Sequence, residues 1–204
     1  MDILGKKIDD YKCLLFDLDG TLINSMVWHN IAWTEAFKEA GLEIPQSLLD
    51  ETMGMASVRI VEIANKRYNT NLDAKKVAAN KRAKYLDNLS KVETVPKLME
   101  IVKKYHGIKP LGIITGGSHA VVDKLLPLLK IDYYFDSIVC ADDTTLGKDS
   151  TQPYEMATEQ LKVDMKDCIF FDDGDVGLKG ARLSGMDVVH VDINSPDVFI
   201  SINK

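Results

Sequence analysis

Five short runs of almost wholly apolar residues recur along this sequence, separated by segments with a helical pattern. The runs span residues 13–16, 111–114, 137–140, 168–171 and 188–191. A strand without polar alternation is buried on both faces, as in a parallel sheet that helices cover on both sides. The repeated strand-to-helix order therefore predicts an α/β fold with a doubly wound, Rossmann-like parallel sheet.

Between these runs, apolar residues recur at the i, i+3, i+4 spacing of amphipathic helices. The pattern covers residues 95–105, 119–129, 154–161 and 178–183 in one part of the chain, and residues 28–40, 58–68 and 74–89 in another. The second group follows the first strand, with no strand between its members. We therefore expect an α-helical cap domain at residues 23–92, inserted into an α/β core domain formed by residues 1–22 and 93–204.

Composition and charge narrow the class of function. The 204 residues are 46% hydrophobic and 27% charged, and the formal net charge is −6. An acidic chain of this kind does not present the broad positive surface that binds nucleic acid or anionic membranes. No apolar run reaches the ~20 residues of a membrane helix. We expect a cytoplasmic protein, monomeric or a small homo-oligomer, with neither nucleic acid nor membrane as a partner.

Cysteines and histidines show no metal signature along the sequence. Cys13, Cys140 and Cys168 each lie in an apolar strand-like run, which predicts small buried side chains rather than a disulfide framework. His119 and His190 lack the spacing of a zinc motif, so we assign them no role.

Acidic residues follow two of the predicted strands. Asp17 and Asp19 come after the first strand, and Asp172 and Asp173 after the fourth. In an open parallel sheet the ligand binds outside the carboxyl ends of the strands, where converging carboxylates repel one another unless a cation intervenes. Mg²⁺ suits such a site because it takes one or two carboxylates, keeps water and is completed by a substrate phosphate. Either pair taken alone is equally well explained by the preference of loops for Asp.

Groups suited to phosphate follow the second and third strands. Thr115 and Gly116 open a turn into a helix, where a hydroxyl and backbone N–H groups can hold a phosphate, although a plain helix start capped by Ser118 also explains the turn. Lys148 lies in a polar loop, where it is suited to neutralise phosphate oxygens or simply to be solvated. Because all these groups fall at one edge of one sheet, we interpret them as a site for phosphoryl transfer through an aspartyl phosphate.

The same residues resemble the motifs of the haloacid dehalogenase superfamily. Its first motif, D-x-D-G-T/V, is matched by residues 17–21, which read Asp-Leu-Asp-Gly-Thr. Its second and third motifs, a strand-terminal Thr or Ser and a loop lysine, resemble Thr115 and Lys148. The fourth, an acidic pair before a Gly- and Ala-rich helix, resembles Asp172 and Asp173. The helical insertion is similar to the small cap of the β-phosphoglucomutase and sugar phosphatase subgroup, with the nearest likeness to fructose-1-phosphate phosphatases.

This resemblance implies a role for each residue. Asp17 would be the nucleophile and an Mg²⁺ ligand, and Asp19 the general acid and base, with its backbone carbonyl on the metal. Asp173 would be the firm metal ligand of the last pair, with Asp172 assisting. The phosphate would be held by Thr115, Gly116 and Lys148.

Three departures from the family pattern bear on these roles. Asn24 stands where the family often has Asp, near the expected cap hinge. The loop after Lys148 reads Asp-Ser-Thr-Gln-Pro instead of continuing the usual K-P-x-P. Asp172 replaces a commoner Glu and is one methylene shorter, so its contact with the metal would need a water.

Specificity in such enzymes comes from the cap, which closes over the core. His29 and Trp33 share one face of the first cap helix, where packing within the cap explains them as well as substrate contact does. Arg59 follows a turn and suits a second anionic or hydroxyl-rich group of the substrate. The basic run that includes Lys81 and Arg82 is best interpreted as a solvated helix surface.

Other functions stay open on the sequence. A β-phosphoglucomutase-type phosphomutase uses the same aspartyl phosphate, but Thr21 favours a phosphatase because the mutases resemble D-x-D-G-V. A receiver-like phosphoacceptor module has its acidic pair and acceptor in the reverse order and lacks a cap. A non-catalytic binding protein is the remaining alternative, although no expected catalytic residue is missing. We therefore expect an Mg²⁺-dependent phosphatase of small phosphate monoesters, foremost sugar phosphates.

Overall fold

A six-stranded sheet forms the centre of the protein in the computed structural model, which describes residues 2–3, 5–196 and 198–203. The strand order is β10-β9-β8-β3-β6-β7. The five parallel strands are β3 (Cys13–Phe16), β6 (Leu111–Ile114), β7 (Ser137–Val139), β8 (Cys168–Asp172) and β9 (Asp187–Val191). The predicted strands and the doubly wound α/β class are therefore confirmed.

The remaining strands are short or lie at an edge, and the sequence pattern did not predict them. β10 (Phe199–Asn203) pairs antiparallel with β9. Two-residue strands form two further antiparallel pairs: β1 (Asp2–Ile3) with β2 (Lys6–Lys7), and β4 (Ile23–Asn24) with β5 (Glu93–Thr94). A two-residue strand has no room for an alternating pattern, so only the folded chain reveals it.

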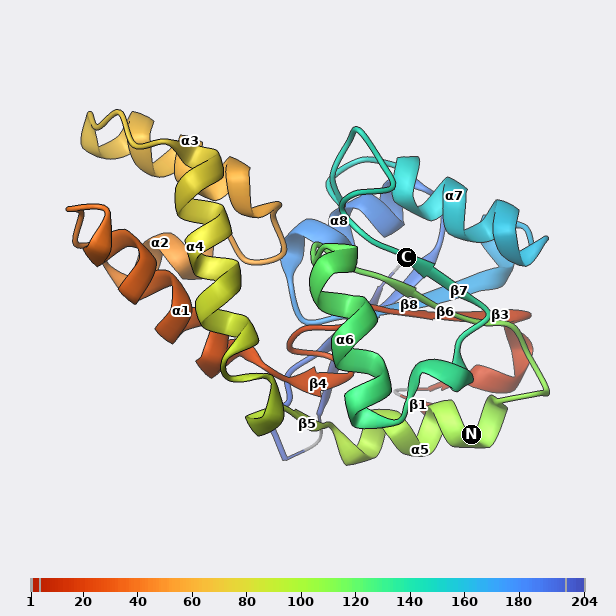
Figure 1. The fold of residues 1–204 in the computed structure, drawn as a ribbon. Helices are drawn as coiled ribbons and strands as arrows, with labels where there is room; N and C mark the ends of the chain where they lie inside the picture. The colour runs from red at the N-terminus through yellow and green to blue at the C-terminus, as the bar shows by residue number, and fades with distance from the viewer. Residues whose placement is uncertain (1, 4, 197, 204) are drawn as a thin grey trace.

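Helices cover both faces of the central sheet (Figure 1). α5 (Pro96–Tyr105) and α6 (His119–Leu129) pack on one face, and α7 (Gln152–Leu161) and α8 (Asp175–Leu183) on the other. Within β3, Leu14 belongs to the first apolar cluster and Leu15 to the second. Both faces of this strand are thus buried, which explains why its sequence is apolar at every position.

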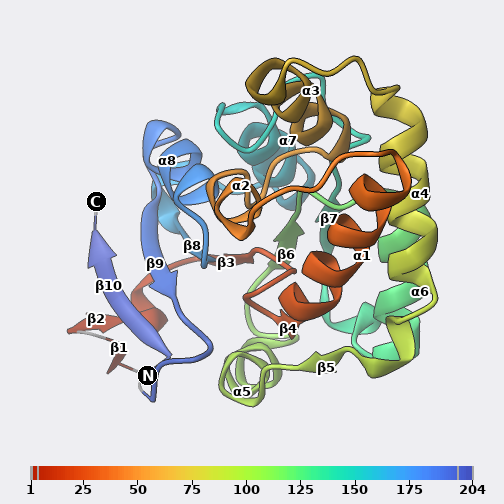
Figure 2. The same ribbon diagram turned by 90° about the vertical axis from the view of Figure 1, so that its left-hand side faces the viewer.

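A separate group of four helices stands beside the sheet (Figures 1 and 2). Its members are α1 (Met26–Glu39), α2 (Gln46–Glu51), α3 (Ser57–Tyr68) and α4 (Ala74–Leu86). They share an apolar core of their own that includes Trp33, Phe37, Leu48 and Val61. α2 was not predicted, because six residues are too few to show a helical period. The antiparallel pair of β4 and β5 lies at the two connections between this group and the rest of the chain.

The described residues also include four short 3₁₀ segments. They are η1 (Ile8–Asp10), η2 (Leu89–Lys91), η3 (Asp132–Tyr134) and η4 (Met165–Asp167). Within the described ranges, no helix is both long enough and apolar enough to cross a membrane.

The strand order places the end of β3 at a topological switch point. From β3 the sheet continues through β6 to β7 on one side, and through β8 to β9 on the other. Phe16 of β3 is paired with Ile113 of β6 and with Phe171 of β8. Residues that follow these three strands therefore emerge side by side, at the kind of crevice where open α/β sheets bind their ligands.

Candidate active site

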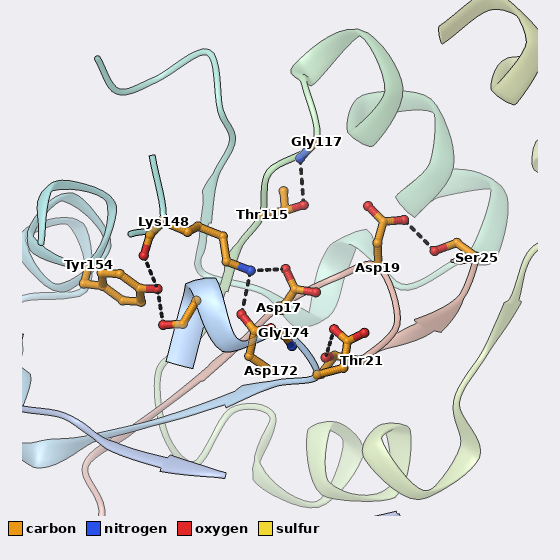
Figure 3. Close-up of polar contacts among 12 residues, drawn as sticks. Asp17, Asp19, Thr21, Ser25, Thr115, Gly117, Lys148, Tyr154, Asp172 and Gly174 are labelled. Atoms are coloured by element: carbon orange, nitrogen blue, oxygen red, sulfur yellow. Dashed lines mark hydrogen bonds and ion pairs between the residues drawn. The ribbon is translucent and has the colours of Figure 1, made fainter. Parts of the chain in front are cut away.

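Asp17 lies at the centre of a buried acidic cluster at this switch point (Figure 3). Its side chain is buried, as is that of Asp172, and its backbone N–H donates to the Phe171 carbonyl oxygen at 2.8 Å. The carboxylates of Asp17, Asp172 and Asp173 each offer an oxygen within 4.8 Å of the others. The folded chain thus brings together carboxylates that lie far apart in the sequence.

Lys148 reaches into the cluster from the loop between β7 and α7. Its Nζ lies 2.5 Å from Asp17 Oδ1 and 2.6 Å from Asp172 Oδ2 (Figure 3). Gly177 of α8 makes this approach possible, because a Cβ there would lie 1.9 Å from Asp172 Oδ2 and 2.6 Å from Lys148 Cε. Tyr154 supports the arrangement, since its hydroxyl lies 2.6 Å from the Gly177 carbonyl oxygen and 3.1 Å from that of Lys148. The altered loop sequence after Lys148 therefore does not displace the lysine from the cluster.

The ionisation of this cluster reflects burial and crowded like charges. Burial raises the pKa of Asp17 well above its ordinary value, with Asp172 and Asp173 adding to the rise and Lys148 opposing it. Burial, followed by the charge of Asp172, raises the pKa of Asp173 to about 7. Burial would lower the pKa of Lys148, but Asp17 and Asp172 outweigh it and raise that pKa, so the ammonium keeps its proton. Three carboxylates face one ammonium, and a divalent cation would offset the remaining negative charge.

The donor set of the cluster fits Mg²⁺. It consists of carboxylate oxygens, the ligands that this hard cation prefers. Neighbouring groups orient them: Thr21 Oγ1 donates to Asp173 Oδ1 at 3.3 Å, and the Gly174 backbone N–H donates to Asp172 Oδ1 at 2.7 Å. Among the predicted metal ligands, the side chains of Asp17, Asp172 and Asp173 come together. The side chain of Asp19 turns away from them (Figure 3).

Asp19 is instead the end of a hydrogen-bonded chain that reaches the helical group. Its Oδ1 accepts from Ser25 Oγ at 2.6 Å and lies 2.8 Å from His29 Nε2. Lys81 Nζ lies 2.5 Å from His29 Nδ1. An ammonium can only donate, so Nδ1 accepts and Nε2 carries the hydrogen that is donated to Asp19. Lys81, His29 and Asp19 thus form a chain with a defined direction.

The pKa values of these hydrogen-bonded residues follow from burial and from the charges of their neighbours. Burial by itself would raise the pKa of Asp19, but His29, Ser25 and Lys81 together lower it below its ordinary value. Burial, with the charge of Lys81, lowers the pKa of His29, which keeps the imidazole neutral. Burial lowers the pKa of Lys81 to about 8. Tyr85 stacks on His29 with ring centroids 3.9 Å apart and shields the chain from water.

Lys81 is buried, with an exposure of 7%. The expectation that it lies on a solvated helix surface is therefore wrong. Its Nζ lies 5.3 Å from the Trp33 ring centroid and 5.1 Å from that of Tyr85. The sequence did carry a signal, because Lys81 follows the buried Val77 by four residues and precedes the buried Tyr85 by four, on the inner face of α4. A lysine at a core position of a helix calls for a specific partner.

A cavity of about 530 Å³ joins the acidic cluster to the helical group. Core residues that line it include Asp17, Thr115, Gly116 and Lys148. Helical-group residues that line it include His29, Trp33, Met55, Lys81, Arg82 and Tyr85. The two parts of the chain therefore line one shared cavity above the acidic cluster.

The turn after β6 forms one wall of this cavity. Thr115 Oγ1 accepts from the Gly117 backbone N–H at 3.0 Å, which folds the turn tightly (Figure 3). A Cβ on Gly116 would lie 2.6 Å from the Gly54 carbonyl oxygen. Only glycine therefore allows the loop between α2 and α3 to pack this closely on the turn.

The structure does not bring Arg59 to the site. Arg59 is not among the cavity-lining residues, its side chain is 68% exposed, and its guanidinium pairs with Glu62 at 3.3 Å. Asn24 is exposed, while its neighbour Ser25 is buried against Asp19. Tyr154 is a further residue of the site that was not predicted, because a tyrosine that binds two backbone carbonyl groups carries no sequence motif.

Comparisons with known proteins agree with this geometry. A family model described as haloacid dehalogenase-like hydrolase matches residues 11–185. Fructose-1-phosphate phosphatase YqaB of Escherichia coli is 31% identical over 185 residues, covering 89% of this chain and 96% of the relative. Beta-phosphoglucomutase of Bacillus subtilis is 26% identical, covering 91% of this chain and 85% of the relative. The crystal structure of CbbY from Rhodobacter sphaeroides superposes with a TM-score of 0.80 at 19% identity, covering 89% of this chain and 86% of that one.

Proposed function

The chain belongs to the haloacid dehalogenase-like hydrolase family, and on that basis we propose that it is an Mg²⁺-dependent phosphatase of small phosphate monoesters. Sugar phosphates are the proposed substrate class, because relatives include a fructose-1-phosphate phosphatase and a 6-phosphogluconate phosphatase. The observation that carries the proposal is the contact of Lys148 with both Asp17 and Asp172, beside Asp173 and at the floor of the cavity shared with the helical group.

In the first step, Asp17 attacks the phosphorus atom of the bound ester. The bond from phosphorus to the sugar oxygen breaks, an aspartyl phosphate forms, and Asp19 gives its proton to the leaving oxygen. Mg²⁺, bound by Asp17, Asp172 and Asp173, would neutralise charge on the transferring phosphoryl group. Lys148 adds a second positive charge at the same place, and Thr115 and the Gly116 backbone N–H hold the phosphate oxygens.

In the second step, Asp19 removes a proton from water, which attacks the aspartyl phosphate and releases inorganic phosphate. The lowered pKa of Asp19 suits this role, because the carboxylate is ready to accept a proton. For the first step Asp19 must take up a proton as the anionic substrate enters. His29 and Lys81 hold the carboxylate in position for both steps.

We further propose that residues 23–92 act as a cap domain over a core formed by residues 1–22 and 93–204. The antiparallel pair of β4 and β5 would be the hinge, since it joins the two connections at these boundaries. His29 already contacts Asp19 across the two parts at 2.8 Å, and closure of the cap would exclude bulk water from the aspartyl phosphate. His29 and Trp33 would then contact the substrate's sugar, whereas Arg59 is not part of the proposed site.

Phosphate release from a panel of sugar phosphates tests the proposal. Fructose 1-phosphate, β-glucose 1-phosphate and 6-phosphogluconate would be incubated with the protein in Mg²⁺ and then in excess EDTA. We expect release in Mg²⁺, loss of release in EDTA, and inactivity of Asp17→Asn in either condition. Conversion of β-glucose 1-phosphate to the 6-phosphate without release would make the protein a mutase. Full activity of Asp17→Asn would contradict the mechanism.

A further inference from the structure

We propose that His119, Cys140 and Asp143 form a second metal site, suited to zinc or a similar transition-metal ion. His119 is the first residue of α6, and the other two lie in the segment that follows β7. A nitrogen, a sulfur and a carboxylate oxygen from these side chains all lie within 4.8 Å of one another. None of the three side chains takes part in the phosphatase chemistry proposed above.

The histidine is oriented as a metal ligand. Its Nε2 lies 3.0 Å from Asp143 Oδ1 and 2.9 Å from Oδ2, while its Nδ1 lies 3.2 Å from Asp123 Oδ1. Metal-binding histidines commonly donate the hydrogen on their other ring nitrogen to a carboxylate, which fixes the tautomer. Asp123 meets that requirement one helical turn after His119. Carboxylates only accept, so without an ion both ring nitrogens donate, Nδ1 to Asp123 and Nε2 to Asp143. A metal ion would replace the Nε2 proton and lie between Nε2 and Asp143.

Backbone contacts hold the two segments together. The Ala141 backbone N–H donates to the Gly117 carbonyl oxygen at 2.9 Å. The Cys140 backbone N–H donates to Asp143 Oδ2 at 2.8 Å, and that of His119 to Asp142 Oδ2 at 3.0 Å. The carboxylate of Asp142 thus satisfies the positive end of α6. The donor groups are preformed and need little movement to close on an ion.

The carboxylates near His119 carry more negative charge than one proton on the imidazole neutralises. Asp123 and Asp143 contact the His119 imidazole, and Asp142 accepts from the His119 backbone N–H. These four groups carry a net charge of about −2 even when His119 is protonated. Binding of a dication would displace the proton of the Cys140 thiol to solvent, and the ion would be held by the thiolate.

The donor chemistry selects the class of ion. Imidazole, thiolate and one carboxylate suit zinc and its neighbours among the transition metals, whereas Mg²⁺ takes oxygen ligands. Three protein ligands leave one position of a tetrahedral ion for water. The sequence hides this site because its ligands come from two segments that only the parallel pairing of β6 and β7 brings together.

The position of the site gives it a structural consequence. Ser118 and Asp142, the neighbours of two ligands, line the cavity above the acidic cluster. A metal ion here would tie the start of α6, and so the phosphate-binding turn at Thr115 and Gly116, to the segment after β7.

Cobalt titration of the metal-free protein tests the proposal. Excess Mg²⁺ would be present to occupy the Asp17 cluster. We expect one equivalent of Co²⁺ to give a near-ultraviolet thiolate charge-transfer band and the intense visible bands of tetrahedral cobalt, both lost when Zn²⁺ is added. Cys140→Ser and His119→Asn should abolish the thiolate band. Cys168→Ser, a buried cysteine on β8, and Asp173→Asn should keep it.

The cobalt spectrum does not depend on phosphatase activity. A failure of the metal-site proposal can therefore be distinguished from a failure of the proposed phosphatase function. Absence of the thiolate band in the unaltered protein would overturn the site, as would its persistence in Cys140→Ser or its loss in Cys168→Ser. Circular dichroism would check that each variant is folded. If Cys140→Ser does not fold, His119→Asn and Asp143→Asn decide, because the His119 side chain is 39% exposed and that of Asp143 is 29% exposed.

Discussion

Lys148 compensates two buried carboxylates, and its removal would leave both of them without a counter-charge. Breaking a buried ion pair on one side costs about 3–5 kcal/mol, and losing one transition-state donor costs about 10²- to 10³-fold in kcat. We therefore expect Lys148→Met to lose at least that much activity and to lower the free energy of unfolding by about 3 kcal/mol without Mg²⁺. Phosphate release and urea unfolding measure the two effects.

Lys12→Met provides the matched control for this prediction. Lys12 pairs with Asp167 at 2.7 Å, but its side chain is 70% exposed. Replacing it should change the free energy of unfolding by no more than about 0.5 kcal/mol and leave phosphate release unaltered. Equal effects of the two substitutions would contradict the buried role of Lys148.

The lowered pKa of Lys81 predicts that activity falls at alkaline pH. Its pKa is lowered from 10.5 to about 8, so above that pH it loses the proton that it donates to His29. We expect kcat to fall as the pH rises through about 8. Lys81→Met should have a lower kcat, by roughly tenfold, and should lack this alkaline limb. An unchanged limb in Lys81→Met would show that another group causes it.

The lowered pKa of Lys81 also determines how the free energy of unfolding changes with pH. A lysine whose folded pKa is lowered binds its proton more weakly in the folded than in the unfolded chain, so burial of its charge destabilises the fold fully below about pH 8. This cost disappears as the pH rises from about 8 to 10.5. Over that window Lys81 should make the free energy of unfolding rise with pH relative to Lys81→Met, as urea titrations can measure.

At the scale of elements, the turn after β6 and the loop between α2 and α3 meet at Gly116. A Cβ there would lie 2.6 Å from the Gly54 carbonyl oxygen, a backbone atom that must move to make room. We expect Gly116→Ala to push the two elements apart, raising KM about tenfold or more while the protein stays folded. Steady-state kinetics and a thermal melt separate these outcomes.

Gly117→Ala is the control for that contact. The atoms nearest to a Cβ there would belong to the Thr115 and Val122 side chains, both at 3.3 Å, and not to the backbone at Gly54. A smaller rise in KM is expected. If both alanines raise KM equally, the effect belongs to the turn itself and not to its contact with the loop.

The strands of the core were predictable because a strand that is buried on both faces is apolar at nearly every position. Leu14 and Leu15 pack on opposite faces of β3, so neither could be polar. The carboxyl ends of parallel strands meet at one edge of the sheet, so the sequence alone predicts that Asp17 and Asp172 are neighbours.

The helical group was less predictable, because a pattern shows that a helix is amphipathic but not what faces it. Arg59 is exposed on α3, whereas Lys81 is buried on α4 and contacts His29. The partner of Lys81 comes from α1, and no local pattern links the two helices. The His119 and Cys140 cluster was invisible for the same reason, since its members belong to different segments.

At the scale of the whole molecule, binding of Mg²⁺ should stabilise the fold. A ligand at about 100 times its Kd adds about 2.7 kcal/mol, which raises the Tm of a protein of this size by roughly 5–10 °C. We expect this rise in Mg²⁺, its reversal by EDTA and a much smaller rise in Asp173→Asn. A Tm that does not respond to Mg²⁺ would contradict the metal-binding role of the acidic cluster.

The most direct test of the account is to trap phosphate on Asp17. The protein would be mixed with its best sugar phosphate in Mg²⁺, quenched in acid and reduced with borohydride, which converts an aspartyl phosphate into homoserine. Mass spectrometry of the peptide that contains residue 17 should then show homoserine, dependent on both substrate and Mg²⁺ and absent from Asp17→Asn. Turnover with an unmodified Asp17, or with the label on another residue, would contradict the proposed mechanism.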